Sequence, residues 1–296
     1  MTTPASPGGR APLAGRTVAR IGFGAMQLGR PTVDRDTAVA LLRQAVAAGV
    51  DHIDTAQFYG PCNDLIRDAL APYPADLMLV SKVGADHAGD RLVPAQRPEE
   101  LRAQVEANLA SLGVERLGAV NLRRVDAPPG LVAEGDQLVD IDDQLAELSA
   151  LRDAGKIGGI GLSNVSLERL RHALPAEIAC VQNNYSLLER SSEPLLELCR
   201  EHGIAWVPFC PLGSAGGAVR LPRPADDPAV IAVAAEIGAT PTQVALAWIL
   251  QHAENALLIA GTSNPAHLAE NLAAGDITLP AAALDANQLL KRPAPQ

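Results

Sequence analysis

The sequence predicts a closed (β/α)8 barrel, an α/β fold made of a single domain. Short apolar runs alternate with longer amphipathic stretches along the 296 residues. The short runs are too apolar to leave one face in water, which is typical of parallel strands covered by helices on both sides. About eight such strand–helix units fit a closed barrel better than an open, doubly wound sheet. No internal repeat or linker divides the chain, so we expect a flexible arm over residues 1–15 and one barrel over residues 16–296.

The predicted elements follow one another in strict alternation. Apolar residues recur at helical spacing between the strands; the helix over 34–49 ends at a glycine, and the helix over 97–113 has a proline near its start. The predicted strands cover residues 18–24, 52–55, 76–82, 116–123, 157–164, 178–183, 204–210 and 256–261. The predicted helices cover residues 34–49, 63–71, 97–113, 141–156, 166–174, 192–203, 227–238, 240–253 and 264–275.

The composition restricts the class of function. The formal net charge of −10 argues against a nucleic-acid-binding surface, which needs clustered Lys and Arg. The four cysteines are widely spaced, without a C-x-x-C pair or a His at metal-ligand spacing, so we expect no disulfide framework and no metal site, and a reducing cytoplasm. The first residues are polar and rich in Pro and Gly. They lack the apolar core of a signal peptide, and no run approaches the length of a membrane span.

A glycine-rich stretch, GFGAMQLG over residues 22–29, matches a dinucleotide-binding fingerprint only in part. Gln27 stands where the third glycine of G-x-G-x-x-G is required, and the stretch leads into a loop instead of a helix. A Walker-type phosphate loop is absent from the sequence. The sequence therefore does not favour a Rossmann nucleotide site.

Polar side chains stand at the carboxyl ends of the predicted strands, which form the working face of a (β/α)8 barrel. Taken singly, each has an ordinary explanation as a capping residue, a solvated strand end or a surface aromatic. Together they bring a carboxylate, a phenol and an ammonium to one rim of the barrel, which indicates a catalytic site. These residues are Asp54, Lys82, Arg123, Ser163 with Asn164, and Gln182, with Tyr59 on the loop after Asp54.

The carboxylate, the ammonium and the phenol can act as a unit. An unperturbed tyrosine, with a pKa of about 10, is a poor proton donor at neutral pH. We expect the ammonium of Lys82 to stabilise the phenolate of Tyr59 and lower this pKa, while Asp54 keeps the ammonium charged and oriented. The product is a general acid suited to protonating an oxygen that gains negative charge, as in carbonyl reduction.

Six segments occur in a recognisable order: HIDTAQFYG, NDLIRDAL, VSK, GIGLSN, QNNYS and PFCPLG. In these segments the chain resembles the aldo-keto reductase superfamily. The resemblance implies a (β/α)8 barrel that uses NADPH without a Rossmann domain and reduces an aldehyde or ketone to an alcohol. It also implies that Asp54, Tyr59 and Lys82 are three of the four catalytic residues, with Tyr59 as the proton donor.

The same resemblance implies a set of cofactor contacts. Ser163, Asn164 and Gln182 match residues that hydrogen-bond the nicotinamide carboxamide, and Phe209 falls where an aromatic residue stacks on the nicotinamide ring. Many relatives hold the 2′-phosphate of NADPH with a Lys and an Arg, and Gly261 and His267 stand at these positions here, so NADH is an alternative to NADPH. The expected cofactor-binding residues are Ser163, Asn164, Gln182, Phe209, Pro211, Leu212, Gly261, Thr262, His267, Glu270 and Asn271.

Arg123 stands where the resemblance implies a catalytic histidine, at the end of the fourth strand. Strand alternation places Asn121 and Arg123 on the face toward the barrel mouth, and Arg124 on the outer rim. An inward arginine could stabilise alkoxide charge, depress the pKa of Tyr59 or bind an anionic group of the substrate. The alternative is that it pairs with an acid of the following loop, such as Asp126, and plugs the site.

The leading hypothesis is an NADPH-dependent aldo-keto reductase that acts on a small-molecule carbonyl substrate, without a nucleic-acid or membrane partner. The alternative is a regulatory or redox-sensing subunit that binds the nicotinamide cofactor and turns over slowly. We expect the loops over 84–98, 124–140 and 211–227 to determine the substrate. Their few aromatic residues favour a polar or compact substrate.

Overall fold

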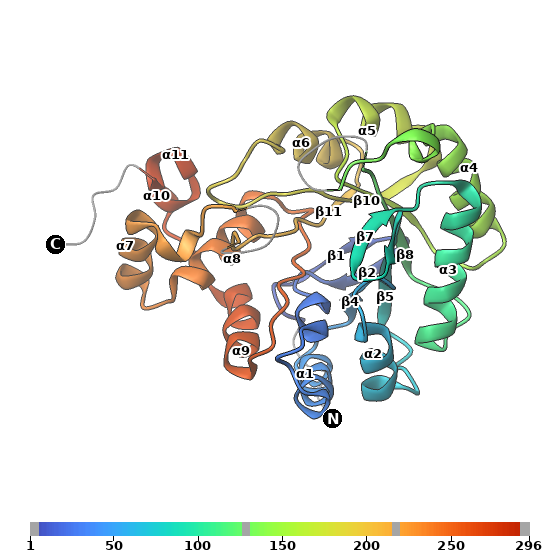
Figure 1. Cartoon of the computed structure of the whole chain (residues 1–296). Helices are drawn as coiled ribbons and strands as arrows, with labels where there is room; N and C mark the ends of the chain where they lie inside the picture. The colour runs from blue at the N-terminus through green and yellow to red at the C-terminus, as the bar shows by residue number, and fades with distance from the viewer. Residues whose placement is uncertain (1–5, 126–130, 215–219, 291–296) are drawn as a thin grey trace.

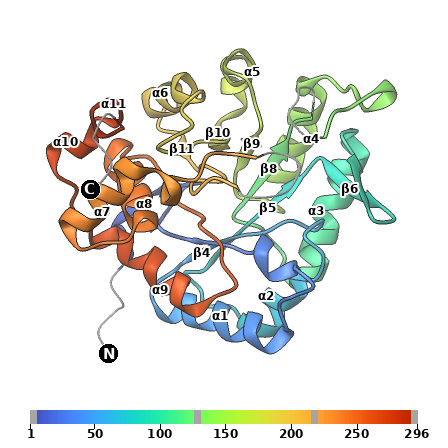
Figure 2. The ribbon, with the colours of Figure 1, turned by 60° about the vertical axis from the view of Figure 1, so that its left-hand side comes forward.

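A computed structural model describes residues 6–125, 131–214 and 220–290 of the chain, and it confirms the (β/α)8 barrel. Seven strands form one parallel sheet that curls round in the order β11-β10-β9-β8-β5-β4-β3. Figures 1 and 2 show that helices surround this sheet. The barrel strands are β3 (Phe23–Gly24), β4 (His52–Asp54), β5 (Met78–Val83), β8 (Ala119–Arg123), β9 (Ile160–Ser163), β10 (Ile178–Gln182) and β11 (Ala205–Trp206).

Isolated bridges hold the eighth segment of the barrel, for which the sequence predicts a strand over 256–261. In the structure, Ala256 bridges to Trp206 next to one edge of the sheet, and Leu258 bridges to Ile21 next to the other edge. Backbone hydrogen bonds of 2.8 Å run along both contacts. This segment therefore closes the barrel between β11 and the start of β3.

The outer helices lie where apolar residues recur at helical spacing, and all the predicted helices are present within a few residues. Helices α3 and α7 end at Gly113 and Gly238, which have the left-handed φ angles of 69° and 67° that favour glycine. Asp34, Ser166 and Thr240 cap α1, α5 and α8 by accepting a hydrogen bond from a backbone N–H of the first turn. The helices are α1 (Arg35–Ala47), α2 (Cys62–Leu70), α3 (Pro98–Leu112), α4 (Ile141–Asp153), α5 (Leu167–Ala173), α6 (Glu193–Glu201), α7 (Pro228–Ile237), α8 (Pro241–His252), α9 (Pro265–Ala273), α10 (Ala281–Leu284) and α11 (Ala286–Leu289), with short 3-10 turns at Met26–Gly29, Gly135–Gln137, Leu174–Ala176, Pro224–Asp226 and Ala274–Asp276.

An amino-terminal hairpin corrects part of the flexible arm that we expected over residues 1–15. Strands β1 (Arg10–Leu13) and β2 (Arg16–Ala19) pair in antiparallel fashion. Alternate side chains of the hairpin, including Leu13 and Val18, are buried against the inside of the barrel. The polar, Pro- and Gly-rich composition concealed this apolar face, which covers the amino-terminal end of the barrel. Residues 1–5 lie outside the described residues.

A second hairpin stands at the opposite end, in the loop over 84–98. Strands β6 (Ala85–Ala88) and β7 (Arg91–Pro94) pair in antiparallel fashion around Gly89, which has a φ of 62°. The hairpin projects beyond the helices that surround the barrel (Figure 2). Because it follows β5 directly, it forms a wall beside the residues at the end of that strand.

Within the three described ranges, no single helix is both long and apolar enough to cross a membrane. Helices α7 and α8 together have the length and apolar composition of a membrane span, but the chain bends by 90° between them.

Candidate active site

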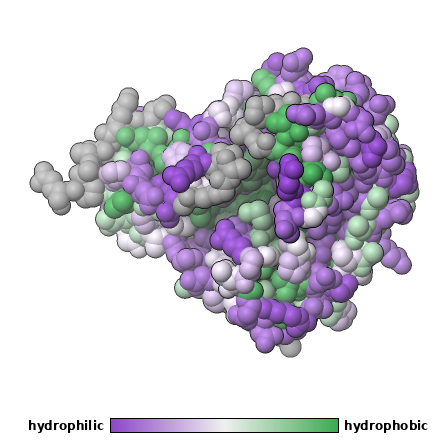
Figure 3. Space-filling model, viewed as in Figure 1, coloured by the Kyte–Doolittle hydropathy of each residue, from purple (hydrophilic) through white to green (hydrophobic). Residues whose placement is uncertain are grey.

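The structure brings the predicted polar residues together at the carboxyl end of the barrel. Each of five neighbouring strands contributes one side chain at or near its last residue: β4, β5, β8, β9 and β10 carry Asp54, Lys82, Arg123, Ser163 and Gln182. The strand register places Ser163 between Arg123 and Gln182. The space-filling view shows a hollow with apolar side chains in the region of the barrel strands, between the side that carries α8 and the side that carries β7 (Figure 3).

A buried ion pair joins Lys82 to Asp54. Their side chains are 8% and 4% exposed, so water screens the pair little. The ammonium also donates to the Thr55 carbonyl at 3.2 Å. Burial alone lowers the pKa of Lys82, but the Asp54 carboxylate and the Tyr59 side chain outweigh it, and the net pKa is raised. Lys82 is therefore a fixed cation at neutral pH.

Tyr59 lies beside this cation. Its ring centre is 4.9 Å from the Lys82 ammonium, and its ring meets the edge of the Phe58 ring with the two centres 5.2 Å apart. Loss of water raises the pKa of Tyr59, and the cations Lys82 and Arg123 oppose this only in part. Lys82 thus acts in the expected direction, but our expectation that the pKa of Tyr59 falls below its ordinary value is wrong, because loss of water has the larger effect. The phenol keeps its proton at neutral pH and is a donor in this state.

Gln182 hydrogen-bonds the ion pair with one side-chain atom and leaves the other, its oxygen, without a hydrogen-bond donor in the described part of the chain. Its side-chain nitrogen donates to Asp54 Oδ2 at 2.7 Å. Its side-chain oxygen is buried and has no hydrogen-bond partner among the described residues. A buried polar atom without a partner costs free energy unless a ligand satisfies it. The carboxamide N–H of a nicotinamide is a donor of the required kind, so the residues here fit that cofactor.

Arg123 points into the mouth, as strand alternation predicts. Its guanidinium carbon lies 5.9 Å from the centre of the Phe58 ring, a cation–π contact. Burial lowers the pKa of Arg123 from its very high ordinary value, and interaction with Tyr59 opposes this change. No carboxylate among the described residues forms an ion pair with Arg123. Asp126, the acid of the alternative explanation, lies outside the described residues.

Arg124 faces away from the mouth, but it does not lie on an exposed rim. The residue is only 3% exposed. Its guanidinium donates to the side-chain oxygen of Gln144 on α4 and, at 3.3 Å, to the Val139 carbonyl. Strand alternation predicted correctly that Arg124 faces away from the mouth. The expected exposed position is wrong, because α4 packs over this side of β8 and buries the side chain.

The remaining nicotinamide candidates lie at the next strand ends. Asn164 has a left-handed φ of 58°, which asparagine tolerates, and its side-chain nitrogen donates to the Arg124 carbonyl at 3.1 Å. Phe209 is half-buried after β11, with buried Pro211 and half-buried Leu212 next to it. These positions follow β11, which lies next to β10 at one edge of the sheet.

The candidates after the eighth segment divide into two kinds. Three of them have partners within the protein: Thr262 Oγ1 accepts from Asn264 N at 3.0 Å, Asn271 donates to the Ala260 carbonyl at 3.4 Å, and Glu270 accepts from the Thr240 hydroxyl. His267 is exposed on the first turns of α9. Gly261 approaches the Gly24 carbonyl so closely that no Cβ atom fits, which explains why a lysine is absent there.

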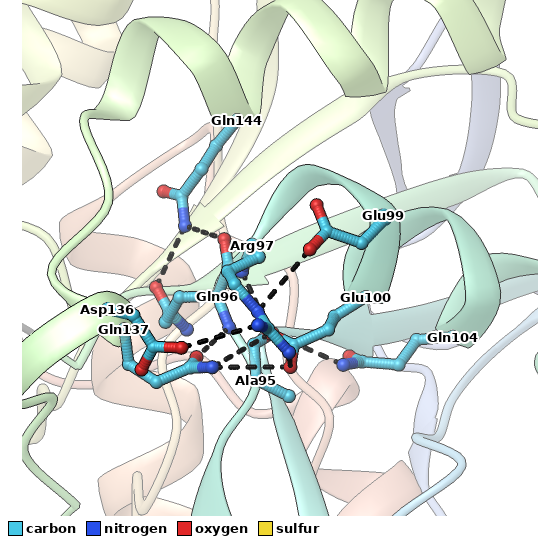
Figure 4. A network of polar contacts seen from close by, with 9 residues as sticks. All are labelled: Ala95, Gln96, Arg97, Glu99, Glu100, Gln104, Asp136, Gln137 and Gln144. Carbon is cyan, nitrogen blue, oxygen red and sulfur yellow. Dashed lines mark hydrogen bonds and ion pairs between the residues drawn. The ribbon is translucent and has the colours of Figure 1, made fainter.

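Sequence analysis missed a cluster of buried amides behind the mouth, together with the ring of Phe58. Figure 4 shows Gln96 on the loop between β7 and α3, with Gln104 of α3 and Gln144 of α4 close to it. Gln96, Gln104 and Gln144 are each less than 5% exposed. A glutamine in a loop or on a helix usually lies in water, so nothing in the sequence indicated that these amides are buried. For Phe58, the scarcity of aromatic residues in the chain was the one available signal.

The described residues contain no group of three or more His, Cys, Asp or Glu side chains that could hold a metal ion.

Comparisons with known proteins agree with this geometry. The family model described as Aldo/keto reductase family matches residues 20–288. Pyridoxine 4-dehydrogenase of Escherichia coli is 44% identical over 276 residues, which cover 90% of this chain and 93% of that protein. An uncharacterized oxidoreductase of Schizosaccharomyces pombe is 33% identical over 284 residues, covering 93% of this chain and 87% of that protein.

Solved structures agree as well. An aldo-keto reductase from Klebsiella pneumoniae, crystallised with NADPH, superposes with a TM-score of 0.78 at 26% identity and covers 99% of this chain and 97% of its own. A second aldo/keto reductase structure from that organism, with NADP and acetate, has a TM-score of 0.77 at 25% identity and covers 96% of each chain.

Removing one partner of the ion pair should destabilise the protein. Lys82→Met leaves the Asp54 carboxylate buried without its cation, which should cost about 3–5 kcal/mol of the free energy of unfolding. Because the pKa of Lys82 is raised, the pair stabilises the fold fully below the ordinary lysine pKa, and this contribution is lost only as the pH rises through the raised value. Denaturant titration at neutral pH measures the loss.

Two further variants make this test specific. Lys82→Met combined with Asp54→Asn removes both charges and should recover much of the stability. Lys156→Met, which breaks a surface pair with Glu106, is the control and should cost about 1 kcal/mol or less. Equal losses for Lys82→Met and Lys156→Met would contradict the assignment of a buried pair.

Proposed function

Because the chain belongs to the aldo/keto reductase family, we propose that this oxidoreductase uses NADPH to reduce an aldehyde or ketone to an alcohol, with Tyr59 as the proton donor. The observation that supports this most strongly is the placement of the Tyr59 phenol beside the buried Lys82, which is charged at neutral pH. The unpaired Gln182 oxygen next to the same ion pair supports a nicotinamide at this position.

Residues around the mouth would hold the cofactor. Gln182, with Ser163 and Asn164, would bind the nicotinamide carboxamide, and Phe209 would stack on its ring. The two Klebsiella pneumoniae relatives crystallised with NADPH and NADP support this choice of cofactor. When bound, the reduced nicotinamide supplies the hydride that the carbonyl carbon receives.

The protein supplies the proton and stabilises the charge that develops on the carbonyl oxygen. As this oxygen becomes negative, the Tyr59 hydroxyl transfers its proton to it. The phenolate that remains is stabilised by Lys82, whose own charge Asp54 balances. Arg123 adds N–H donors in a partly dry mouth, where a fixed cation stabilises an oxyanion more than it does in water.

Arg123 also indicates the class of substrate. We propose a compact ring aldehyde with an ionisable hydroxyl on the ring carbon next to the one that bears the aldehyde group. The relative named Pyridoxine 4-dehydrogenase is named for an alcohol that corresponds to such an aldehyde: pyridoxine carries a hydroxymethyl group at position 4 and a hydroxyl on the adjacent ring carbon. The Arg123 guanidinium, which contacts the Phe58 ring and interacts with the Tyr59 phenol, could bind that oxygen while the neighbouring carbonyl reacts.

Tyr59→Phe should abolish reduction and preserve cofactor binding, because only the proton donor is lost. We expect kcat to fall about 10²–10⁴-fold, measured by NADPH oxidation with pyridoxal, while the NADPH dissociation constant stays the same by fluorescence titration. Tyr73→Phe is the matched control, because the Tyr73 hydroxyl donates to the Leu112 carbonyl, remote from the mouth. Since the pKa of Tyr59 is raised, reduction in the unchanged protein should persist into the alkaline range and decline only above that raised pKa.

Preference for NADPH over NADH should be weak, because Gly261 and His267 stand where many relatives have a lysine and an arginine. Fluorescence titration with both cofactors gives the ratio of dissociation constants. His267→Arg should strengthen NADPH binding and leave NADH binding unchanged, since the new charge meets only the 2′-phosphate. Ala269→Arg adds the same charge at another exposed position of α9 and should change neither. Binding of neither cofactor by the unchanged protein would refute the nicotinamide assignment.

Arg123→Ala should reduce kcat/KM for pyridoxal by about 10²-fold, the effect of removing one preorganised oxyanion donor. With pyridine-4-carbaldehyde, which lacks the adjacent hydroxyl, the loss should be smaller. Arg123→His should recover the second substrate more than the first. Arg171→Ala removes an exposed arginine of α5 and is the control. If Arg123→Ala leaves turnover of both aldehydes intact, the proposed role of Arg123 is wrong.

A further inference from the structure

The strands that carry Lys82 and Arg123 separate at the barrel mouth. The last pair in the β5–β8 ladder is Val83 with Leu122. Beyond it, the β5–β8 ladder supplies no further N–H between the two strands. The Gly84 carbonyl accepts from the Ala95 N–H at 3.2 Å, but this bond lies within the loop after β5 and does not join Gly84 to β8. The next connection between the two strand ends comes from a side chain.

Gln96 supplies this connection from the loop before α3. Its side-chain nitrogen donates to the Gly84 carbonyl at 2.5 Å and to the Arg123 carbonyl at 2.9 Å. One amide therefore replaces the missing rung of the ladder between β5 and β8. It acts on the backbone at the residue whose side chain enters the mouth.

The geometry of Gly84 supports this bridge independently. Gly84 has a left-handed φ of 104°, and a Cβ atom there would lie 2.5 Å from the Arg123 carbonyl oxygen and 2.6 Å from the Gln96 nitrogen. Only glycine permits this approach. The two strand ends are therefore brought together at a distance that the Gln96 amide can span.

The orientation of the Gln96 amide is determined by its surroundings. Its oxygen and its backbone carbonyl accept from Gln144 at 3.0 and 2.7 Å, and its backbone N–H donates to Gln137 at 2.6 Å (Figure 4). Reversal of the amide would place its oxygen against two carbonyl oxygens. Gln96 is 2% exposed, so water cannot replace these partners.

The same cluster holds the outer side of β8. Gln144 accepts from the guanidinium of Arg124, and the Arg124 carbonyl accepts from Asn164 at 3.1 Å. The backbone from Arg123 to Arg124 is thus bound by α4, by the loop before α3 and by the end of β9. The Arg123 Cα atom, from which the side chain projects into the mouth, therefore has little freedom to shift.

We propose that Gln96 is a positioning residue for Arg123. By joining the Arg123 carbonyl to the end of β5, its amide sets the position of the guanidinium relative to Tyr59 and Lys82, although Gln96 itself belongs to the layer behind the mouth. The proposal rests on the role of Arg123 in the proposed function. It adds that the arginine works only in the place that this amide gives it.

Gln96→Glu provides the test, because it keeps the shape and replaces the two N–H donors with oxygen. Facing the Gly84 and Arg123 carbonyls, the new oxygen should push the strand ends apart. We expect kcat/KM for pyridoxal to fall about 10- to 10²-fold, the size expected when a reacting group is misplaced by about 1 Å. NADPH affinity should remain unchanged.

A double-mutant cycle separates positioning from a general effect on structure. If Gln96 acts through Arg123, Gln96→Glu should cost nothing more in an Arg123→Ala background. Equal costs in both backgrounds would overturn the proposal, since a general structural loss adds independently. Gln251→Glu is the control, because the Gln251 amide also donates to two carbonyls, those of Ala247 and Ile277, far from the mouth; it should leave kcat/KM unchanged.

Further results distinguish this proposal from the proposed function. If Gln96→Glu does not fold, Gln96→Met removes the donors without adding an opposing oxygen, and the same cycle applies. Full turnover in Tyr59→Phe would overturn the proposed function and leave the Gln96–Arg123 coupling measurable. A loss in Gln96→Glu together with no loss in Arg123→Ala would overturn the positioning proposal, because the amide would then act on another group.

Discussion

The buried ion pair between Asp54 and Lys82 is the interaction on which the barrel mouth depends. Two charges withdrawn from water are stable only when other polar groups complete their hydrogen bonding. The Thr55 carbonyl and the Gln182 amide do so, and they tie β4, β5 and β10 together at one end of the barrel. Tyr59 and the unpaired Gln182 oxygen are consequently held beside a fixed charge. The chemistry of the site follows from this pairing more than from any single residue.

A second constraint is the close approach of backbone segments around the same mouth. Gly84 meets the Arg123 carbonyl, and Gly261 meets the Gly24 carbonyl, in places where no Cβ atom fits. In the first place the short distance allows a glutamine to join two strands. In the second it excludes the long cation that could hold a 2′-phosphate. Shape thus limits which charged side chains the proposed cofactor site can contain.

Sequence analysis predicted the barrel and the location of the site because hydrophobic periodicity reports burial directly. The helix expected over 141–156 occupies Ile141–Asp153, and the polar strand ends converge as expected. The alternation around Arg123 gave the correct side of the strand, but it could not give the depth of Arg124, which depends on how α4 packs. The predicted direction of the Tyr59 pKa shift was wrong for a related reason. The loss of water around the phenol depends on every residue packed against it, and it raises the pKa by more than Lys82 lowers it.

Other features left no periodic trace. The amino-terminal hairpin has only a few apolar positions among prolines and glycines, so its composition resembled a loose arm. The function of Gln96 depends on residues of β5, β8 and α4 that lie far from it in the sequence. A single amide in a loop carries no sign of such partners, and its role became visible only when the strand ends were seen together.

The closure of the barrel by Ala256 and Leu258 has a consequence for biosynthesis. That side of the sheet is complete only when Leu258 has bridged to Ile21, which is more than 200 residues earlier in the sequence. Until then a growing chain carries a curved sheet with two unpaired edges, at β3 and at β11, and such edges readily pair with other chains. Contacts between distant parts of a chain also form slowly. A nascent polypeptide of this protein is thus most exposed to aggregation just before the segment that holds Ala256 and Leu258 is synthesised.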